Sequence, residues 1–296
     1  MIASLAQRYS VAVVKPGPWA RRLYKLLRSL GKKTPLKLPY AGLGRWVART
    51  LGAGRQDLLL CNEGELFRGF NTSIVQAFAG RKVLLVRDLI DAAALERARP
   101  MFDRIYSFDP AQCAALGIDH LEQFFPYTAG KARALGQQGS ATPGAPRFFF
   151  LGREKGRSAA VHGIADALAQ YPGTLDFHLV GAPVSSPYHV AAPYSYRESI
   201  RMALAADVLV EVNQAGQAGF TLRVLEALFF DKKLLTTNAQ VAAADFYDPA
   251  RFFIWGVDPI ERLPGFISGT PPAVAPAVLE RLGPEAMIKR VASALG

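Results

Sequence analysis

The strongest constraint on the fold is a repeated alternation of short, continuous apolar runs with longer amphipathic stretches. The first half of the chain has four such runs, at residues 10–14, 57–61, 82–86 and 104–108. Runs that are apolar throughout are typical of parallel strands buried on both faces, and the amphipathic segments between them are typical of covering helices. The pattern predicts the α/β class.

The alternation restarts after residues 136–146, which contain no core-forming side chains and indicate a linker. Strands are predicted at 147–151, 175–180, 207–212, 233–237 and 252–255, and helices at 158–170, 196–205 and 220–230. We therefore expect two Rossmann-like domains that face a cleft, at 1–140 and 147–275, and a C-terminal helix at 276–296 that packs back across them. Because ligands of such sheets bind at the carboxyl ends of strands, the loops after the strands are the expected sites.

Positive charge is concentrated in the N-terminal half. Residues 1–146 contain 21 Lys and Arg against 10 Asp and Glu, whereas residues 147–296 contain 14 of each kind. The first acidic residue is Asp57, and 12 basic residues precede it. Such a field attracts phosphates, so this half is expected to have its own anionic partner. Nucleic acid is disfavoured, because basic–aromatic interleaving is confined to residues 19–49 and no recognition motif is present.

Residues 19–30 are predicted to form an amphipathic helix that starts after Pro16-Gly-Pro18. At 100° per residue its apolar side chains gather in one arc and its cations lie largely opposite. The apolar set is Trp19, Leu23, Leu26, Leu27 and Leu30, and the cations are Arg21, Arg22, Lys25 and Arg28. Two interpretations stay open: an interfacial helix that binds an anionic membrane or acceptor, and an ordinary first helix that packs its leucines on the sheet.

Two loops in the second half carry the features of a phosphate site. Gly152-Arg-Glu-Lys-Gly-Arg157 puts three cations and two glycines between a predicted strand and a helix. The glycines let the backbone approach a ligand, and the helix N-terminus offers free N–H groups. A solvated strand-to-helix turn is the alternative.

The other loop runs from Asn213 through Gln217 and Gly219 into a helix. Thr221 and Arg223 fall in its first turn, where they are within reach of an anion. Glu226 lies on the same face as Arg223, and a carboxylate there suits a ribose diol because it accepts two hydroxyl donors. A surface Arg–Glu pair is the alternative.

These loops also carry a resemblance to a known family. Gly219-Phe-Thr-Leu-Arg-Val-Leu-Glu-Ala-Leu228 resembles the Gly-Phe-Gly-Leu-Pro-x-x-Glu-Ala-Met segment of family 4 GT-B glycosyltransferases, and Phe150-Leu-Gly-Arg-Glu-Lys-Gly156 resembles their Gly-Arg…Lys-Gly loop. The resemblance implies Arg153 and Lys155 on a donor diphosphate and Glu226 on the nucleotide ribose. Gly152, Asn213 and Gln217 complete the expected donor site. Two positions depart from the family pattern: Ala218 replaces its first glutamate and Arg223 its proline.

A second resemblance covers residues 57–256. Phe102-Asp-Arg-Ile-Tyr-Ser-Phe-Asp-Pro110, Tyr194-Ser-Tyr-Arg-Glu-Ser199 and Asp245-Phe-Tyr-Asp248 are similar to segments of bacterial lipopolysaccharide and capsule biosynthesis proteins. It implies transfer of a sugar from a nucleotide-sugar donor to a lipid-linked or glycan acceptor. The nucleotide sugar is then a substrate, and neither a cofactor nor a metal is expected. A glycosyl- or polyol-phosphate transferase, a sugar-nucleotide epimerase and a non-catalytic binding subunit of the same fold stay open as alternatives.

Catalysis of an inverting reaction needs a base, and carboxylates follow two predicted strands of the first half. Glu63 and Glu65 follow the strand at 57–61, and Asp88 follows the strand at 82–86. Asp91 has the helix cap as its ordinary role. Cys61 and Cys113 have no metal spacing and are expected to be reduced. The sequence lacks a secretory signal pattern and an 18-residue apolar run, so we expect a cytoplasmic protein, peripheral on the inner face of the membrane.

Overall fold

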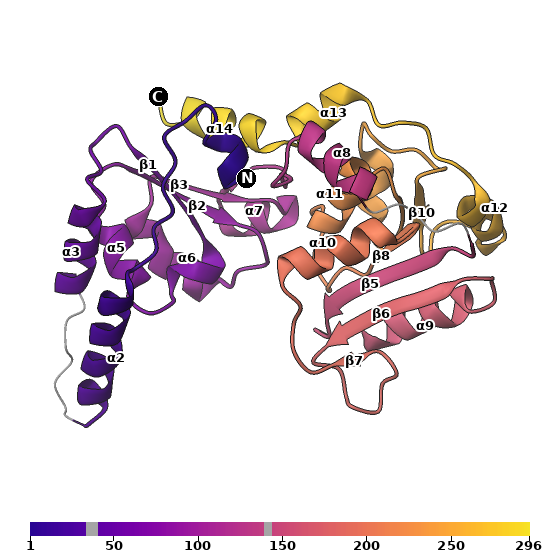
Figure 1. The fold of residues 1–296 in the computed structure, drawn as a ribbon, viewed down its shortest axis with the longest axis horizontal. Coiled ribbons are helices and arrows are strands. Elements are labelled where there is room, and N and C mark those ends of the chain that lie inside the picture. The colour runs from indigo at the N-terminus through magenta and orange to yellow at the C-terminus, as the bar shows by residue number, and fades with distance from the viewer. Residues whose placement is uncertain (34–40, 139–143) are drawn as a thin grey trace. The chain divides into compact units, whose positions relative to one another are not determined.

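The computed structural model describes residues 1–33, 41–138 and 144–296 (Figure 1). The chain divides into two compact units. The C-terminal unit comprises residues 122–288 together with 1–7, and the N-terminal unit comprises 8–121 together with 289–296. Each unit is built on its own parallel sheet, so the predicted α/β class is confirmed.

The sheet of the C-terminal unit has six parallel strands in the order β10-β9-β8-β5-β6-β7. The strands are β5 (Arg147–Arg153), β6 (Thr174–Val180), β7 (His189–Val190), β8 (Val208–Glu211), β9 (Lys233–Thr236) and β10 (Phe252–Ile254). The chain builds outward from β5 to β7, then returns to the other side of β5 and continues through β8 to β10. This is the doubly wound order, and its direction reverses between β5 and β8.

Alternation along β5 divides the core of this unit between the two faces of the sheet. Phe148 and Phe150 pack against α9 (Ser158–Leu168) and α12 (Leu263–Ser268). Phe149 points to the opposite face. The helices of that face are α8 (Ala129–Gln138), α10 (Tyr196–Ala205) and α11 (Leu222–Phe229), with α13 (Pro276–Arg281) beside α8.

The sheet of the N-terminal unit has the order β1-β2-β3-β4, without reversal. Its strands are β1 (Leu58–Asn62), β2 (Arg81–Val86), β3 (Arg104–Ser107) and β4 (Asp119–His120). Its connecting helices are α4 (Glu63–Leu66), α5 (Asn71–Ala77), α6 (Ala92–Ala98) and α7 (Pro110–Leu116). Two short or terminal helices complete the chain: α1 (Ile2–Leu5) and α14 (Pro284–Ser293).

Two N-terminal helices, α2 (Pro18–Lys33) and α3 (Ala41–Thr50), pack on this unit beside α5. Ala20, Leu43 and Val47 are buried against Phe70 and Ile74. The approach of α3 to α5 depends on Gly44, because a Cβ atom built there would lie 2.3 Å from the Cβ of Ser73. Only a glycine allows the two backbones to come this close.

Some predicted features differ in the structure. The strand predicted at 10–14 is wrong: those residues have no ladder partner, and Val13 is 46% exposed. An apolar run specifies a strand only where an edge is available for pairing. The predicted linker at 136–146 begins inside α8, and residues 139–143 lie outside the described part of the chain. The two units divide between Leu121 and Glu122.

Among the described residues, no helix combines the length and apolar character needed to cross a bilayer.

Candidate functional site

The reversal between β5 and β8 brings the two glycine-containing loops together. The strands pair directly, with Phe148 opposite Val208 and Phe150 opposite Val210. The loop at 152–157 leaves the carboxyl end of β5, and the loop at 213–221 leaves the carboxyl end of β8. Ligands of doubly wound sheets bind at this kind of crevice. The two loops selected from the sequence therefore leave neighbouring strand ends.

Arg157 ties these strand ends together. Its Nη1 donates to the carbonyl of Val212 at 2.7 Å, and its Nε donates to the carbonyl of Arg153 at 2.9 Å. The guanidinium lies over Gly152, where a Cβ atom would come within 3.0 Å of Nη2. Gly152 therefore provides room for an intramolecular bridge across the switch point.

The remaining charges of the first loop face different surroundings. The carboxylate of Glu154 accepts from the N–H of Gly156 at 2.8 Å and from the hydroxyl of Ser158 at 2.9 Å. These hydrogen bonds lower the pKa of Glu154 and place a negative charge at the start of α9. Arg153 and Lys155 are exposed, and Lys155 has a left-handed backbone with φ +41°. The loop thus presents its two cations to solvent and holds the carboxylate of Glu154 at the start of α9.

The second loop is held by residues that follow β9. Asn238 is 4% exposed, and its Nδ2 donates to the carbonyls of Ala218 and Gly219 at 3.2 and 3.4 Å. The backbone N–H of Asn213 donates to Oγ1 of Thr237 at 2.9 Å. The Nδ2 of Asn213 donates to the carbonyl of Gln217 at 3.3 Å. The loop is therefore folded onto the ends of two strands.

One polar atom of this loop is left without a partner. Oδ1 of Asn213 is buried and has no hydrogen-bond partner in the protein. A buried acceptor in this state is costly, so such atoms commonly mark places where a water or a ligand donates. Asn213 is one of the residues that the sequence predicts to bind the donor.

Beneath the loop lies a buried carboxylate that the sequence-based selection missed. Glu211, at the end of β8, is 4% exposed and accepts hydrogen bonds from the hydroxyls of Thr221 and Thr236. Thr221 is also the N-cap of α11, because its Oγ1 accepts from the N–H of Arg223 at 3.0 Å. Burial raises the pKa of Glu211, while the two hydroxyls and the guanidinium groups of Arg223 and Arg157 act in the opposite direction.

Arg223 and Glu226 form a buried ion pair on α11. Their side chains are 10% and 3% exposed, and Nη1 of Arg223 donates to Oε2 of Glu226. The guanidinium also lies over the ring of Phe149, with Cζ 4.8 Å from the ring centroid. Burial raises the pKa of Glu226, Arg223 lowers it, and nearby Glu211 raises it again. The alternative of a surface Arg–Glu pair is excluded by this burial.

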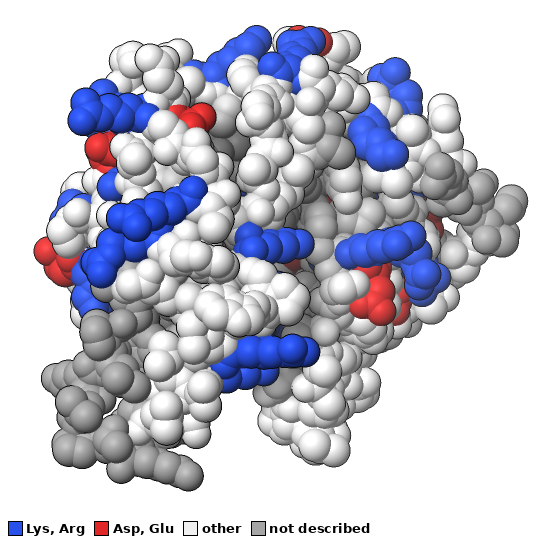
Figure 2. Space-filling model, turned by 60° about the vertical axis from the view of Figure 1, so that its left-hand side comes forward, with Lys and Arg blue, Asp and Glu red and all other residues white. Residues whose placement is uncertain are grey.

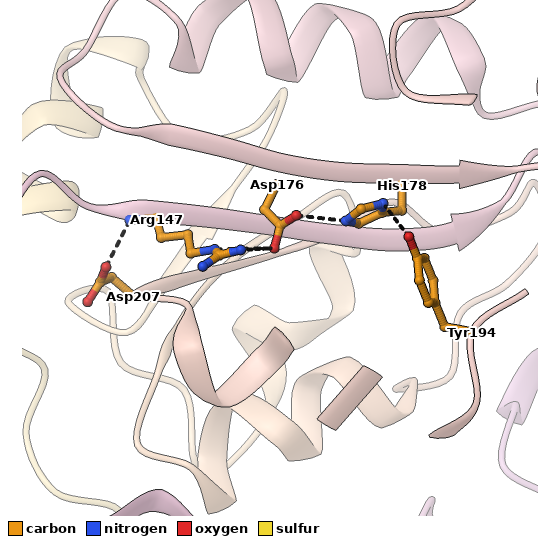
Figure 3. Close-up of polar contacts among 5 residues, drawn as sticks. All are labelled: Arg147, Asp176, His178, Tyr194 and Asp207. Atoms are coloured by element: carbon orange, nitrogen blue, oxygen red, sulfur yellow. Dashed lines mark hydrogen bonds and ion pairs between the residues drawn. The ribbon is translucent and has the colours of Figure 1, made fainter. Parts of the chain in front are cut away.

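A second polar network spans β5, β6 and the segment before α10 (Figure 3). The carboxylate of Asp176 pairs with Nη2 of Arg147 and with Nε2 of His178, each at 2.7 Å. Nδ1 of His178 lies 3.3 Å from the hydroxyl of Tyr194. The backbone N–H of Arg147 donates to Asp207 at 2.8 Å. These contacts connect the segment that precedes α10 to β6 through Tyr194, and β6 to β5 through Asp176 and Arg147.

The carboxylates of the N-terminal unit divide into two kinds. Glu63 begins α4, and its Oε2 accepts from the N–H of Arg87 at 3.0 Å. Burial raises the pKa of Glu63, and the charge of Asp88 at the end of β2 adds to the effect. Glu65 is 53% exposed and pairs with Arg68 at 2.7 Å. Glu63 and Asp88 therefore lie together, whereas Glu65 points to solvent.

The ordinary role considered for Asp91 is confirmed, since its Oδ1 caps α6 by accepting from the N–H of Ala94 at 2.7 Å. On α2 the predicted cations are all exposed, and Trp19 is 60% exposed. Nε of Arg21 donates to the carbonyl of Pro16 at 2.8 Å. Within the described residues, no group of three His, Cys, Asp or Glu side chains has a metal-binding arrangement.

Some of the functional residues that sequence reasoning missed had recognisable signals. Glu211 is a lone charge inside the run Val208-Leu-Val-Glu-Val212, which is unusual for a strand buried on both faces. Asp176 and His178 alternate with Leu175, Phe177 and Leu179, so a single face of β6 is polar. Arg157 and Asn238 carried no such signal, because their roles depend on strands brought together by the fold.

Among known proteins, the chain has a likeness in structure and none in sequence. No family model and no curated protein sequence matches the chain. Among solved structures, the chain is similar to one described as "lipopolysaccharide outer core galactosyltransferase WaaB apo form", with 14% identity and a TM-score of 0.45. The match covers 88% of this chain and 82% of the other.

Proposed function

We propose that the protein is a glycosyltransferase of the GT-B type that moves a sugar from a nucleotide-sugar donor to a lipid-linked or lipopolysaccharide or capsule glycan acceptor. The observation that carries the proposal is the strand order of the C-terminal unit. The loops that resemble the donor loops of GT-B enzymes leave β5 and β8, the two strands between which the order reverses. A diphosphate nucleotide is the ligand class that this position favours.

In this proposal Arg153 and Lys155 neutralise the donor diphosphate, which removes the need for a bound metal. Their exposure leaves both cations accessible to a ligand. Asn213 lies on the neighbouring loop, where its buried Oδ1 would accept from a hydroxyl or amide of the nucleotide. Gly219 and Thr221 shape the turn that carries the backbone toward it.

The proposed ribose contact of Glu226 requires a rearrangement. Glu226 is 3% exposed, and its carboxylate is paired with Arg223. A phosphate is a strong acceptor for a guanidinium, so an incoming diphosphate would compete with Glu226 for Arg223. We infer that donor binding exchanges this ion pair for an Arg223–phosphate contact and frees Glu226 for the ribose hydroxyls.

For the proton transfer from the acceptor, Glu63 is the preferred base. A base works best when its pKa is near the working pH, and burial moves the pKa of Glu63 in that direction. Asp88 would act on it through its charge. Exposed Glu65, which is paired with Arg68, lacks such an environment.

The test is a thermal-shift screen of the purified chain with UDP-, GDP-, ADP-, TDP- and CMP-sugars. One nucleotide class should stabilise the protein, by about 2.7 kcal/mol at a ligand concentration 100 times its Kd, which amounts to several degrees. Arg153→Ala should abolish most of this shift without lowering the melting temperature of the free protein, because Arg153 is exposed. Arg133→Ala, an exposed cation of α8, is the matched control and should keep the shift. If no nucleotide shifts the melting temperature, the donor assignment is wrong.

A non-catalytic binding subunit is the second candidate. It is favoured by Ala218 in place of the family's first glutamate and by the closed Arg223–Glu226 pair. Donor turnover separates the two: an enzyme should release nucleoside diphosphate slowly in the absence of acceptor, and Glu63→Gln should reduce transfer with acceptor at unchanged nucleotide affinity. Nucleotide binding with no turnover under any acceptor condition would favour the binding subunit.

A further inference from the structure

The outer side of α2 and α3 is both apolar and exposed. Trp19, Leu26, Leu30 and Trp46 are 60%, 56%, 47% and 48% exposed, and we call these four residues the Trp19–Trp46 surface. The buried side of α2 is a different one, formed by Ala20 with Leu23 and Tyr24. Thus the predicted apolar arc is split: Leu23 packs inward, whereas Trp19, Leu26 and Leu30 face solvent.

The two tryptophans come from different helices and form a pair. Their ring centroids are 5.3 Å apart, and the rings are tilted by 59°. The helix that carries Trp46 is fixed against α5 through Gly44, Leu43 and Val47. The surface is therefore a preformed feature of two packed helices, and about half or more of each of its four side chains stays exposed.

Positive charge surrounds this surface. Arg21, Arg22, Lys25 and Arg28 on α2 are exposed, as are Arg45 and Arg49 on α3. Neither helix contains an acidic residue. Figure 2 shows that Lys and Arg side chains are spread over the visible face and that Asp and Glu are few on it. A partner must therefore be anionic and must also accept tryptophan and leucine side chains.

We propose that the Trp19–Trp46 surface docks on an anionic phospholipid bilayer. Tryptophan favours the boundary between headgroups and acyl chains, leucine enters the acyl region, and the flanking cations bind anionic headgroups. A nucleic acid would use the cations and stack on the aromatic rings, but it would leave Leu26 and Leu30 in water. The bilayer is the partner that satisfies both the leucines and the charges.

The docking surface stands independently of the proposed transferase activity, since it lies in the N-terminal unit and uses none of the donor-loop residues. It also suits that activity, because a lipid-linked acceptor is presented at a membrane. The two proposals are therefore tested by separate measurements.

The experiment is flotation of the full chain with vesicles of phosphatidylcholine alone and with vesicles that also contain phosphatidylglycerol at about one lipid in three, which gives their surface a negative potential. Binding is expected to the anionic vesicles and to weaken with salt. Trp19→Ala/Trp46→Ala should lower the partition coefficient by about tenfold or more, because the apolar anchors are lost. Arg22→Gln/Lys25→Gln/Arg28→Gln should lower it on anionic vesicles, and its residual binding should depend less on salt than that of the wild type, because Arg21, Arg45 and Arg49 remain.

A matched control truncates exposed apolar side chains outside the Trp19–Trp46 surface. Val257→Ala/Ile260→Ala truncates side chains that are 64% and 46% exposed in the C-terminal unit, and it should leave vesicle binding unchanged. Depth is measured by fluorescence quenching with brominated lipid in Trp255→Phe, which leaves Trp19 and Trp46 as the tryptophans of the chain. Quenching supports insertion.

Equal binding by the wild-type chain and Trp19→Ala/Trp46→Ala, or tryptophans that are not quenched, would overturn the proposal. So would preferential binding to duplex DNA in a competition with the anionic vesicles. The tryptophan variant must keep the wild-type melting temperature and nucleotide shift, which separates loss of docking from loss of folding and from any failure of the donor assignment.

Discussion

At the scale of single residues, the C-terminal unit contains two buried glutamates, and only one of them forms an ion pair with an arginine among the described residues. Glu211 and Glu226 are both buried, and Arg223 is the guanidinium that pairs directly with one of them. Glu211 instead depends on the hydroxyls of Thr221 and Thr236. Hydrogen bonds from neutral donors compensate a buried charge less than an ion pair does. The raised pKa of Glu211 is the expected consequence.

The pKa shift of Glu211 predicts how stability depends on pH. With a raised pKa the folded state holds the proton more tightly than the unfolded chain does. This stabilisation is present below the ordinary pKa of glutamate and is lost as the pH rises toward the folded-state pKa. Glu211→Gln removes the loss, so its free energy of unfolding should exceed that of the wild type increasingly as the pH rises from the ordinary pKa of glutamate toward the folded-state pKa, by about 1–3 kcal/mol once the carboxyl group is ionised. Urea unfolding at several pH values measures it.

Glu154→Gln is the control of opposite sign. The pKa of Glu154 is lowered by hydrogen bonds from Gly156 and Ser158, so its contribution is present at neutral pH and is lost as the pH falls through the lowered pKa. This variant should lose stability at neutral pH and approach the wild type at low pH. If the free energies of unfolding of Glu211→Gln and of the wild type change with pH in parallel, the pKa of Glu211 is not raised in the folded state.

At the scale of elements, local signals predicted the structure well where they agreed with the packing. The helix predicted at 196–205 is found as Tyr196–Ala205, and a capping box between Ser195 and Glu198 fixes its start. The failures are non-local. Residues 10–14 have strand composition but no edge to pair with, and the two-residue strands β4 and β7 exist only through their neighbours. In the site, the loops followed from glycine and charge spacing, whereas the Arg157–Val212 bridge required the adjacency of β5 and β8.

The packing of α3 on α5 predicts that a larger residue at position 44 destabilises the protein. A Cβ atom at this position would lie within 2.6 Å of the Cβ, C and O atoms of Ser73, so the two helices would have to separate. Gly44→Ala should destabilise the protein by about 1–3 kcal/mol through overpacking. Gly42→Ala is the matched control on the same helix, because nothing lies within 4 Å of its Cβ position. It should be neutral or stabilising by up to about 1 kcal/mol through helix propensity. Chemical denaturation followed by circular dichroism compares them, and equal effects would contradict the close contact.

At the scale of the whole molecule, sheets and cores are segregated. The C-terminal unit has two hydrophobic clusters, one on each face of its sheet. The N-terminal unit has its own clusters, one around β1, β2 and β3 and one around α2, α3 and α5. Charge is segregated along the chain as well, since the excess of Lys and Arg lies in residues 1–146. Units with separate cores are expected to unfold as separate cooperative blocks.

Hydrogen exchange measured along a urea titration tests this division. Peptides from β1, β2 and β3 should lose protection together, and peptides from β5, β8 and β9 should lose it together at a different midpoint, because each sheet shares one core. Gly44→Ala should lower the first midpoint alone, and a nucleotide identified by the thermal-shift screen should raise the second alone. A single midpoint for all peptides, moved equally by the variant and by the nucleotide, would mean that the chain folds as one cooperative unit and that its two sheets are energetically coupled.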